Sequence, residues 1–347
     1  MDRTPRTTAF VATAIGAALV AAVVTQLTPS SAAQPKAQTD ATARIVSAAQ
    51  EVAHLLDAAG QKKVQFPFES AQRTKWSNLP SPMFQRDGVR LADLTIPQRA
   101  AVMKLLTVAL SREGYQKALE IMHGDEVLKQ SSGGRGGPSF GEDQYWLAFV
   151  GTPSTTTPWI LQFGGHHLAI NLTLSGSETS MTPSLPAVQP ATYTVEGRTV
   201  RPLGDENDKA FALINALDAK QKSQAILPSR VADLVLGPGQ DGRTIQPEGI
   251  RAAALTPQQQ IMLWEIVHEW AGIVTDAYAE PRMTEIKSHL NDTYFAWSGP
   301  TTNGSAAYFR IQGPTLVIEY APQGSVDHIH TIYRDPTNDY GARFARR

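Results

Sequence analysis

Four of the eight histidines of this 347-residue chain lie in two tight clusters. His166 and His167 are adjacent, and one residue separates His328 from His330. Residues two apart in an extended segment face the same side, so His328 and His330 can converge on one ion. Adjacent strand residues face opposite sides, so only one of His166 and His167 can join them. We therefore predict a metal site, with a hydrogen-bonded histidine cluster as the structural alternative.

The polarity of the surrounding strand decides between the two adjacent histidines. The pattern predicts one long strand over 159–174, on which His167 and Asn171 share a mostly polar face. The opposite face is apolar and consists of Leu168, Ile170 and Leu172. This favours His167 as the ligand, with His166 and Asn171 as supporting residues behind it. A bulge at Gly164–Gly165 would reverse the choice.

Two charged residues lie on a second predicted strand, over 306–320. Glu319 aligns with Asn171 when the two halves of the chain are compared, and it is a candidate fourth ligand or general base. Arg310 can bind a substrate carboxylate or pair with a nearby acid. The sequence therefore places a candidate catalytic carboxylate and a candidate substrate-binding cation on this strand.

The segment 333–341, directly after the second histidine cluster, is dense in polar groups. Asp339 is a further candidate ligand or general base, and Arg334 a further candidate for binding a substrate anion. Asp335 can orient an imidazole from behind. A turn rich in Asp and Asn that closes the domain is the structural alternative.

The composition limits the cofactors and partners. The chain has no cysteine, so histidine, carboxylate or backbone oxygen must hold any metal, and Zn, Cu and Fe all suit histidine. No P-loop, dinucleotide fingerprint or nucleophile elbow is present, and we expect no nucleotide cofactor. The 31 basic and 32 acidic residues form no basic stripe, which argues against nucleic acid. We expect a small-molecule or extracellular substrate.

The first 33 residues have the features of a cleavable signal peptide. Arg3 and Arg6 precede an apolar stretch over 9–27, and Ser31 and Ala33 are small residues at the expected cleavage site. A retained membrane anchor is the alternative. Residues 34–40 are then predicted to be a polar linker. No later segment contains 18 apolar residues in a row, so we expect a secreted or extracytoplasmic protein whose mature chain has no transmembrane span.

The rest of the chain repeats itself. Leu94-Thr95 recurs as Leu255-Thr256, 161 residues later, and the segment 160–165 resembles 308–313. Each copy predicts a helix (41–59, capped by Asp40, and 206–217), a longer helix (95–129 and 256–290) and a β-hairpin. We therefore predict an α+β fold with internally duplicated halves and an antiparallel sheet packed against helices. It would form a single globular domain over 41–347, with repeats at about 41–190 and 205–341.

Three stretches carry a family resemblance: Phe163–Asn171, Tyr308–Tyr320 and His328–Gly341. They resemble hallmark stretches of a bacterial secreted family that is catalogued as a domain of unknown function, DUF3500. The resemblance extends back through Leu94–Gln98 and covers nearly the whole mature chain. It implies no activity, but it implies a shared pattern that includes His166, His167, Arg310, Glu319, His328, His330, Arg334, Asp335 and Asp339.

Three hypotheses follow for the function. The first is a secreted metal-dependent enzyme, either a hydrolase or an oxidoreductase, because three histidine ligands suit both chemistries. The second is a non-catalytic secreted protein that binds a metal or a small ligand in the same pocket. The third is a structural role, in which the histidines lock the two halves together.

Overall fold

The computed structural model describes Met1 and residues 33–132 and 138–345. The expected signal peptide, apart from its two end residues, lies outside the described residues. Within the described ranges, no helix has the length and apolar character needed to cross a membrane.

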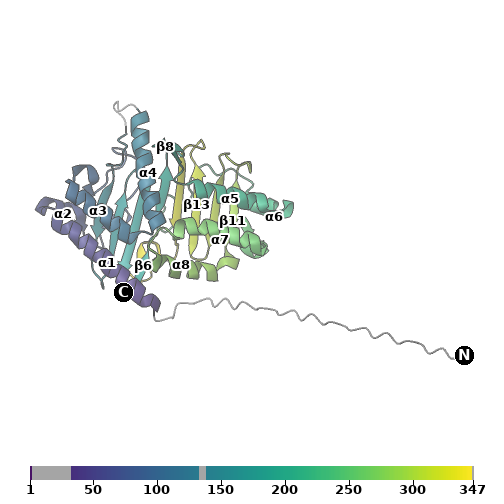
Figure 1. Ribbon diagram of the computed structural model, residues 1–347, viewed down its shortest axis with the longest axis horizontal. Coiled ribbons are helices and arrows are strands. Elements are labelled where there is room, and N and C mark those ends of the chain that lie inside the picture. Colours follow the sequence, from purple (N-terminus) through teal and green to yellow (C-terminus); the bar gives the residue numbers. More distant parts are fainter. Residues whose placement is uncertain (2–32, 133–137, 346–347) are drawn as a thin grey trace.

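One large sheet organises the described chain (Figure 1). Its central strands run in the order β3-β4-β5-β7-β14-β13-β12-β11, so β7 and β14 join the two halves at the middle. The short β1 is parallel to β3, whereas the other described strand pairs in the sheet are antiparallel. The fold is α+β as expected, but the sheet is mixed at this one pair. The central strands are β3 (Trp146–Val150), β4 (Trp159–Gly164), β5 (Leu168–Ser175), β7 (Leu185–Val188), β11 (Tyr294–Ser298), β12 (Tyr308–Gly313), β13 (Leu316–Pro322) and β14 (Ile329–Arg334).

Short strands complete the sheet at its edges and within its loops. β10 pairs with β11 at one edge, and β2 pairs with β3 near the other. β6 pairs with β5, and β8 and β9 form a separate two-stranded ladder. These strands are β1 (Gln65–Phe66), β2 (Val89–Arg90), β6 (Glu178–Ser180), β8 (Tyr193–Val195), β9 (Arg198–Val200) and β10 (Ile250–Arg251).

The α-helices of the described residues cover one face of the sheet (Figure 1). Two apolar cores lie between helices and sheet, one under the first four helices and one under the later ones. Burial of these apolar side chains is the main force that holds the layers together. The helices are α1 (Ala33–Leu55), α2 (Ala58–Val64), α3 (Ile96–Ala109), α4 (Arg112–Ser131), α5 (Gly204–Ala216), α6 (Ala219–Ala225), α7 (Pro257–Ala271) and α8 (Asp276–Ser288).

The first helix differs from its predicted bounds. It begins at Ala33, so residues 34–40, which we expected to form a linker, are its first turns. Asp40 is therefore not the N-cap but an interior residue paired with Lys36. The helix ends at Leu55, and the side chain of Asp57 caps the separate helix α2 by accepting a hydrogen bond from the backbone N–H of Gly60.

The two predicted long helices are each a pair of helices. Thr95 and Thr256 are N-caps as expected, and each is part of a capping box. The first pair breaks at Leu110, whose backbone is extended, and Ser111 then caps α4. The second pair breaks after Gly272, the C-cap of α7. The prediction missed these breaks because apolar residues resume after each of them, although Ser111 and Gly272 are local cap signals.

The two predicted long strands are hairpins. β4 and β5 are antiparallel and are joined by a tight turn at His166–His167. β12 and β13 are joined in the same way at 314–315. The histidine pair therefore occupies turn positions and not strand positions, so the strand-parity argument for choosing His167 was wrong. The apolar residues on either side suggested one continuous strand, although Gly164-Gly165 and Gly313-Pro314 are local turn signals at these positions.

The second face of the sheet is covered by two long loops, over 67–88 and 228–248. A third, smaller apolar cluster lies here and includes Trp76, Ala187 and Ile332. The elements of the two halves follow the same order outward from β7 and β14, but the duplication itself stays a prediction from the sequence. The loops matter for function because they approach the histidines at the centre of the sheet.

Candidate metal centre

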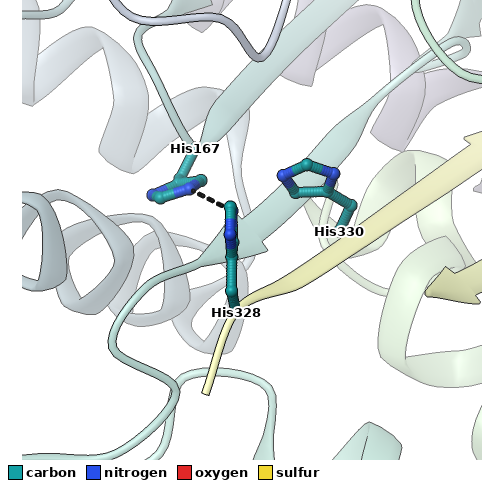
Figure 2. A group of neighbouring side chains, drawn as sticks. All are labelled: His167, His328 and His330. Carbon is teal, nitrogen blue, oxygen red and sulfur yellow. Dashed lines mark hydrogen bonds between the residues drawn. The ribbon is translucent and has the colours of Figure 1, made fainter. Parts of the chain in front are cut away.

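Three histidines from the two halves of the chain meet at the centre of the sheet. His328, directly before β14, and His330, the second residue of β14, project toward the turn that carries His167 (Figure 2). The Nε2 atoms of His167 and His328 are 3.3 Å apart, and the rings of His328 and His330 are centred 4.6 Å apart. One ligand atom from each of the three side chains lies within 4.8 Å of the other two. The histidine clusters found in the sequence are therefore neighbours in space.

Backbone hydrogen bonds at the middle of the sheet position these side chains. His330 is in register with Ala187 of β7 on one side and Ala321 of β13 on the other. The N–H of Ala187 donates to the carbonyl of His167 at 2.7 Å, which fixes the β4–β5 turn against the same strand. The carbonyl of His328 accepts from the N–H of Gln323 at 2.7 Å and closes the turn before β14.

Asp125 supports His167 from behind. Its Oδ1 lies 2.7 Å from Nδ1 of His167, and its Oδ2 accepts a hydrogen bond from the hydroxyl of Tyr145, also at 2.7 Å. A carboxylate can only accept here, so Nδ1 of His167 carries the proton and Nε2 carries the lone pair. That lone pair faces His328 (Figure 2). A carboxylate behind an imidazole in this way is the usual support for a histidine that binds a metal.

His167 and His328 are held in the neutral form. Burial lowers the pKa of His167 to about 4, although Asp125 opposes this effect. Burial, together with the neighbouring His330 and His167, lowers the pKa of His328 to about 3. Burial would raise the pKa of Asp125, but His167 and His166 outweigh it and hold that pKa below its usual range. At neutral pH, His167 and His328 are therefore unprotonated and Asp125 is ionised, which is the protonation state that metal ligation requires of them.

The separation of the imidazole nitrogens fits a shared ion. Two nitrogens that each lie about 2.0–2.1 Å from a tetrahedral zinc ion are about 3.3 Å apart. The distance between Nε2 of His167 and Nε2 of His328 is 3.3 Å. Without an ion, Nε2–H of His328 can donate to the lone pair on Nε2 of His167, so the same distance also suits the hydrogen-bonded cluster of the structural alternative. The donor set nevertheless fits a transition metal.

Asp125, His166 and His167 form a second group whose ligand atoms also lie close together. Here the contact between Asp125 Oδ1 and His167 Nδ1 is 2.7 Å, shorter than the roughly 3.3 Å between two ligands of one tetrahedral ion. It is the length of a charge-assisted hydrogen bond. His166 Nδ1 lies 3.3 Å from the same oxygen, and its ring packs against Phe140. We therefore assign Asp125 and His166 to the support of His167.

The site is accessible mainly through His328. His167 is fully buried and His330 is 9% exposed, whereas His328 is partly exposed. The two long loops supply the remaining neighbours. Asn78 Nδ2 lies 3.3 Å from the ring nitrogens of His330, and Asp233 Oδ1 lies 3.7 Å from its Nδ1. An ion and a small molecule can thus approach from the side of His328.

Gly165 allows the histidine turn to approach its support. A Cβ at this position would lie 2.7 Å from both the carbonyl oxygen of Gln144 and a ring carbon of Tyr145. Such contacts are far inside van der Waals distance, so only glycine fits. The guanidinium of Arg86 donates to the carbonyl of Gly165 and fastens the same turn from the loop over 67–88.

Glu319 and Arg310, which we expected near the metal, serve other contacts. Glu319 is fully buried and accepts hydrogen bonds from the backbone N–H groups of Val235 and Leu236 at 2.6 and 2.8 Å. The hydroxyl of Tyr308 donates to it as well. Arg310 is 3% exposed and pairs with Glu248. These two residues tether the loop over 228–248 to the sheet, and they lie outside the histidine group.

The polar segment after β14 is likewise used internally. Arg334 is 2% exposed and donates to the carbonyls of Leu236 and Gly237 and to the carboxylate of Asp339. Asp335 accepts hydrogen bonds from the backbone N–H and the hydroxyl of Thr337. This is the Asp- and Asn-rich turn that was the structural alternative for this segment. The amide of Asn171, the other expected supporting residue, bonds Gln162 and the carbonyl of Pro183. Among the hydrogen bonds and ion pairs of the described residues, none joins Arg334, Asp335, Asp339 or Asn171 to the three histidines.

Sequence reasoning missed Asp125 and Tyr145. Asp125 lies within the helix predicted over 95–129, and no role was predicted for it; in the structure it belongs to α4, which continues to Ser131. The available signal was position: Asp125 follows Ala118, Ile121 and Met122 on the buried stripe of α4, where an acid is costly without a partner. An acid on an apolar helix face is a reason to look for a buried cation or histidine.

The model of one protein family, described as a protein of unknown function (DUF3500), matches residues 38–342. The chain belongs to this family. The match spans every residue of the histidine group and its support, so the site lies within the DUF3500 region. No match was found among curated proteins or among solved structures.

Proposed function

We propose that this DUF3500 protein binds one transition-metal ion through His167, His328 and His330. The observation that carries the proposal is the 3.3 Å separation of two Nε2 atoms, one of which has its lone pair fixed toward the other by Asp125. The third histidine, His330, lies on β14, and His328 directly precedes this strand, so the strand fixes one ligand and holds the other close to it. The burial of His167 and His330 keeps competing water away from two of the ligands.

We further propose that the bound ion leaves a coordination position open for water or a substrate. Three protein ligands with one open position are typical of catalytic zinc sites, and such an ion activates water or polarises a substrate oxygen. The partial exposure of His328 supports an opening on that side. Asp233, more than half exposed and 3.7 Å from His330, is the acidic side chain in position to take up a proton there. Zn, Cu and Fe remain the candidate ions, for hydrolysis or oxidation.

A non-catalytic role in binding a metal or small ligand is the second candidate. It is favoured by the internal hydrogen bonds of Glu319 and Asp339, the carboxylates that we expected to act as bases. We also propose export by the N-terminal segment, so that either function operates outside the cytoplasm. There the ion must be captured from the surroundings by a chain without thiols.

Elemental analysis of protein purified without a histidine tag tests metal binding. We expect about one equivalent of a transition metal in the chain after reloading, and its loss in His328→Ala with His330→Ala. His54→Ala, an exposed position on α1, is the matched control and should retain the metal. Less than about 0.1 equivalent in the reloaded wild-type protein would overturn the proposal. Turnover of esters, polymers or peroxide by the loaded protein, absent from the double variant, would separate an enzyme from a binding protein.

A further inference from the structure

A small pocket lies on the second face of the sheet, beneath the loop over 67–88. Its walls are formed by residues of that loop and by the strands β3, β4 and β5. The pocket has a volume of about 30 Å³, whereas about 10–15 Å³ is enough for one water molecule. It therefore has room for about two water-sized atoms, such as the two oxygens of a carboxyl group. The exposed side chains of Lys75 and Asp87 lie at its wall, so the pocket meets the solvent there.

Arg86 brings a largely buried positive charge without a counter-ion to this pocket. Its Nη2 atom donates to the backbone carbonyls of Ser77, Leu79 and Gly165. Among the described residues, neither Nε nor Nη1 has a hydrogen-bond partner, and no carboxylate lies within 4 Å of the guanidinium. Neither atom is enclosed, so a ligand can reach them. Burial lowers the pKa of Arg86 to about 10, although Asp125 opposes this effect, and an added anion would stabilise the cation.

Two further donors that line the same pocket lack an acceptor. Ser77 is buried, and its hydroxyl oxygen accepts from the N–H of Leu79, but its own hydrogen has no acceptor among the described residues. The indole N–H of Trp146 likewise makes no hydrogen bond within the described part of the chain. Oε1 of Gln72 is an acceptor without a donor, but it carries no charge. The free donors therefore point to a ligand that accepts hydrogen bonds.

The charges and the aromatic wall of the pocket narrow the ligand class. Its charged lining residues are Lys75, Arg86 and Asp87, and Lys75 pairs with Asp87 at 2.6 Å. The charge that is left over is that of Arg86, so the pocket favours an anion. The planar fork of a guanidinium matches the two oxygens of a carboxylate. The ring of Trp146 is centred 5.6 Å from the guanidinium carbon and offers an apolar surface beside it.

We propose that the pocket beneath the loop over 67–88 is an anion site that takes the carboxylate group of a small organic acid. The carboxylate accepts hydrogen bonds from Arg86 and from the indole N–H of Trp146, and the apolar part of the acid lies against the indole ring. This site goes beyond the proposed metal function. None of its lining residues belongs to the histidine group, although Arg86 also fastens the turn that carries His167.

Calorimetric titration of the metal-free protein with sodium butyrate tests the site. The protein is metal-free because a carboxylate also binds metal ions, and sodium chloride keeps the ionic strength constant. We expect saturable binding of one butyrate per chain and none of butyramide, its neutral analogue. Equal binding of butyramide, or no saturable binding of butyrate, would overturn the proposal.

Arg86→Gln removes the charge and should weaken butyrate binding about tenfold or more. Arg73→Gln, on the same loop but outside the pocket, is the matched control and should stay within about twofold of the wild type. If circular dichroism shows that Arg86→Gln does not fold, Trp146→Phe decides, because it keeps an aromatic ring and removes the N–H. Equal affinity in the deciding variant and in the control would overturn the proposal. A negative result leaves the histidine site untouched, because none of these changes removes a metal ligand.

Discussion

The carboxylate of Asp125 lies 2.7 Å from Nδ1 of His167 and turns the other nitrogen of that ring toward His328. Asp125 lies on α4 in the first half of the chain. It therefore sets the tautomer of His167, which meets His328 and His330 of the second half. We predict that Asp125→Asn lowers metal affinity about 10–100-fold, as the loss of such supporting partners usually does. Competition with a chromophoric chelator measures the change. Asp87→Asn, on a half-exposed ion pair with Lys75, is the control, and equal affinity in the two variants would contradict this assignment.

Removing the hydroxyl of Tyr145 should cost stability. Tyr145→Phe leaves Oδ2 of Asp125 buried without its donor, and an unsatisfied buried acceptor costs about 1–3 kcal/mol. Denaturant unfolding of the metal-free protein measures this loss. Tyr115→Phe is the control. Tyr115 is half-buried, and its hydroxyl makes no hydrogen bond to the described residues, so this change should alter stability by less than about 0.5 kcal/mol.

Gly165→Ala should abolish metal binding while the protein remains folded. The added methyl group would meet the Gln144 carbonyl and the Tyr145 ring at 2.7 Å, so the turn that carries His167 must move. The control is Gly124→Ala on α4, next to Asp125, where the nearest atom to the new methyl group is 3.4 Å away. We expect one metal equivalent in the control and none in Gly165→Ala. Full metal content in Gly165→Ala would show that the turn is not tightly held.

Metal binding should stabilise the contact between the two halves. β7 and β14 share only two register pairs, Ile329 with Val188 and His330 with Ala187, and the ion would connect His167 to His328 and His330 across this junction. An ion present at 100 times its dissociation constant adds about 2.7 kcal/mol to the free energy of unfolding. Thermal unfolding with and without a chelator tests this expectation. An unchanged midpoint in the wild type would contradict it.

Glu319 should affect stability but not the metal. Glu319→Gln keeps the volume but replaces one acceptor oxygen with a donor that faces the backbone N–H groups of Val235 and Leu236. We expect a loss of about 1–3 kcal/mol and an unchanged metal content. Loss of metal together with an intact fold would instead support Glu319 as a ligand. Denaturant unfolding and elemental analysis of the same sample give both results.

Local patterns predicted much of the fold. Thr95 and Thr256 are the helix caps that their spacing indicated, and the helices and hairpins follow in the expected order. The breaks at Leu110 and at the His166–His167 turn were missed. Both positions carry local signals, Gly164-Gly165 before the turn and Ser111 as the cap of α4, but the apolar residues on either side suggested one continuous element.

The histidines were identified from the sequence because His328 and His330 share one face of an extended segment. The role of Asp125 was not identified, since it depends on packing between α4 and the β4–β5 turn, which no local pattern encodes. Glu319 and Arg334 were predicted to be functional, but they tether a loop. In a sequence, buried charged residues that tether a loop cannot be distinguished from residues of a catalytic site.

X-ray absorption spectroscopy at the metal edge of the reloaded protein tests the central claim most directly. The account predicts three imidazole nitrogens at about 2.0–2.1 Å for zinc, with one further light atom, and loss of this imidazole signature in His328→Ala with His330→Ala. A first shell of oxygen atoms alone, or a spectrum identical in the wild type and the double variant, would contradict it.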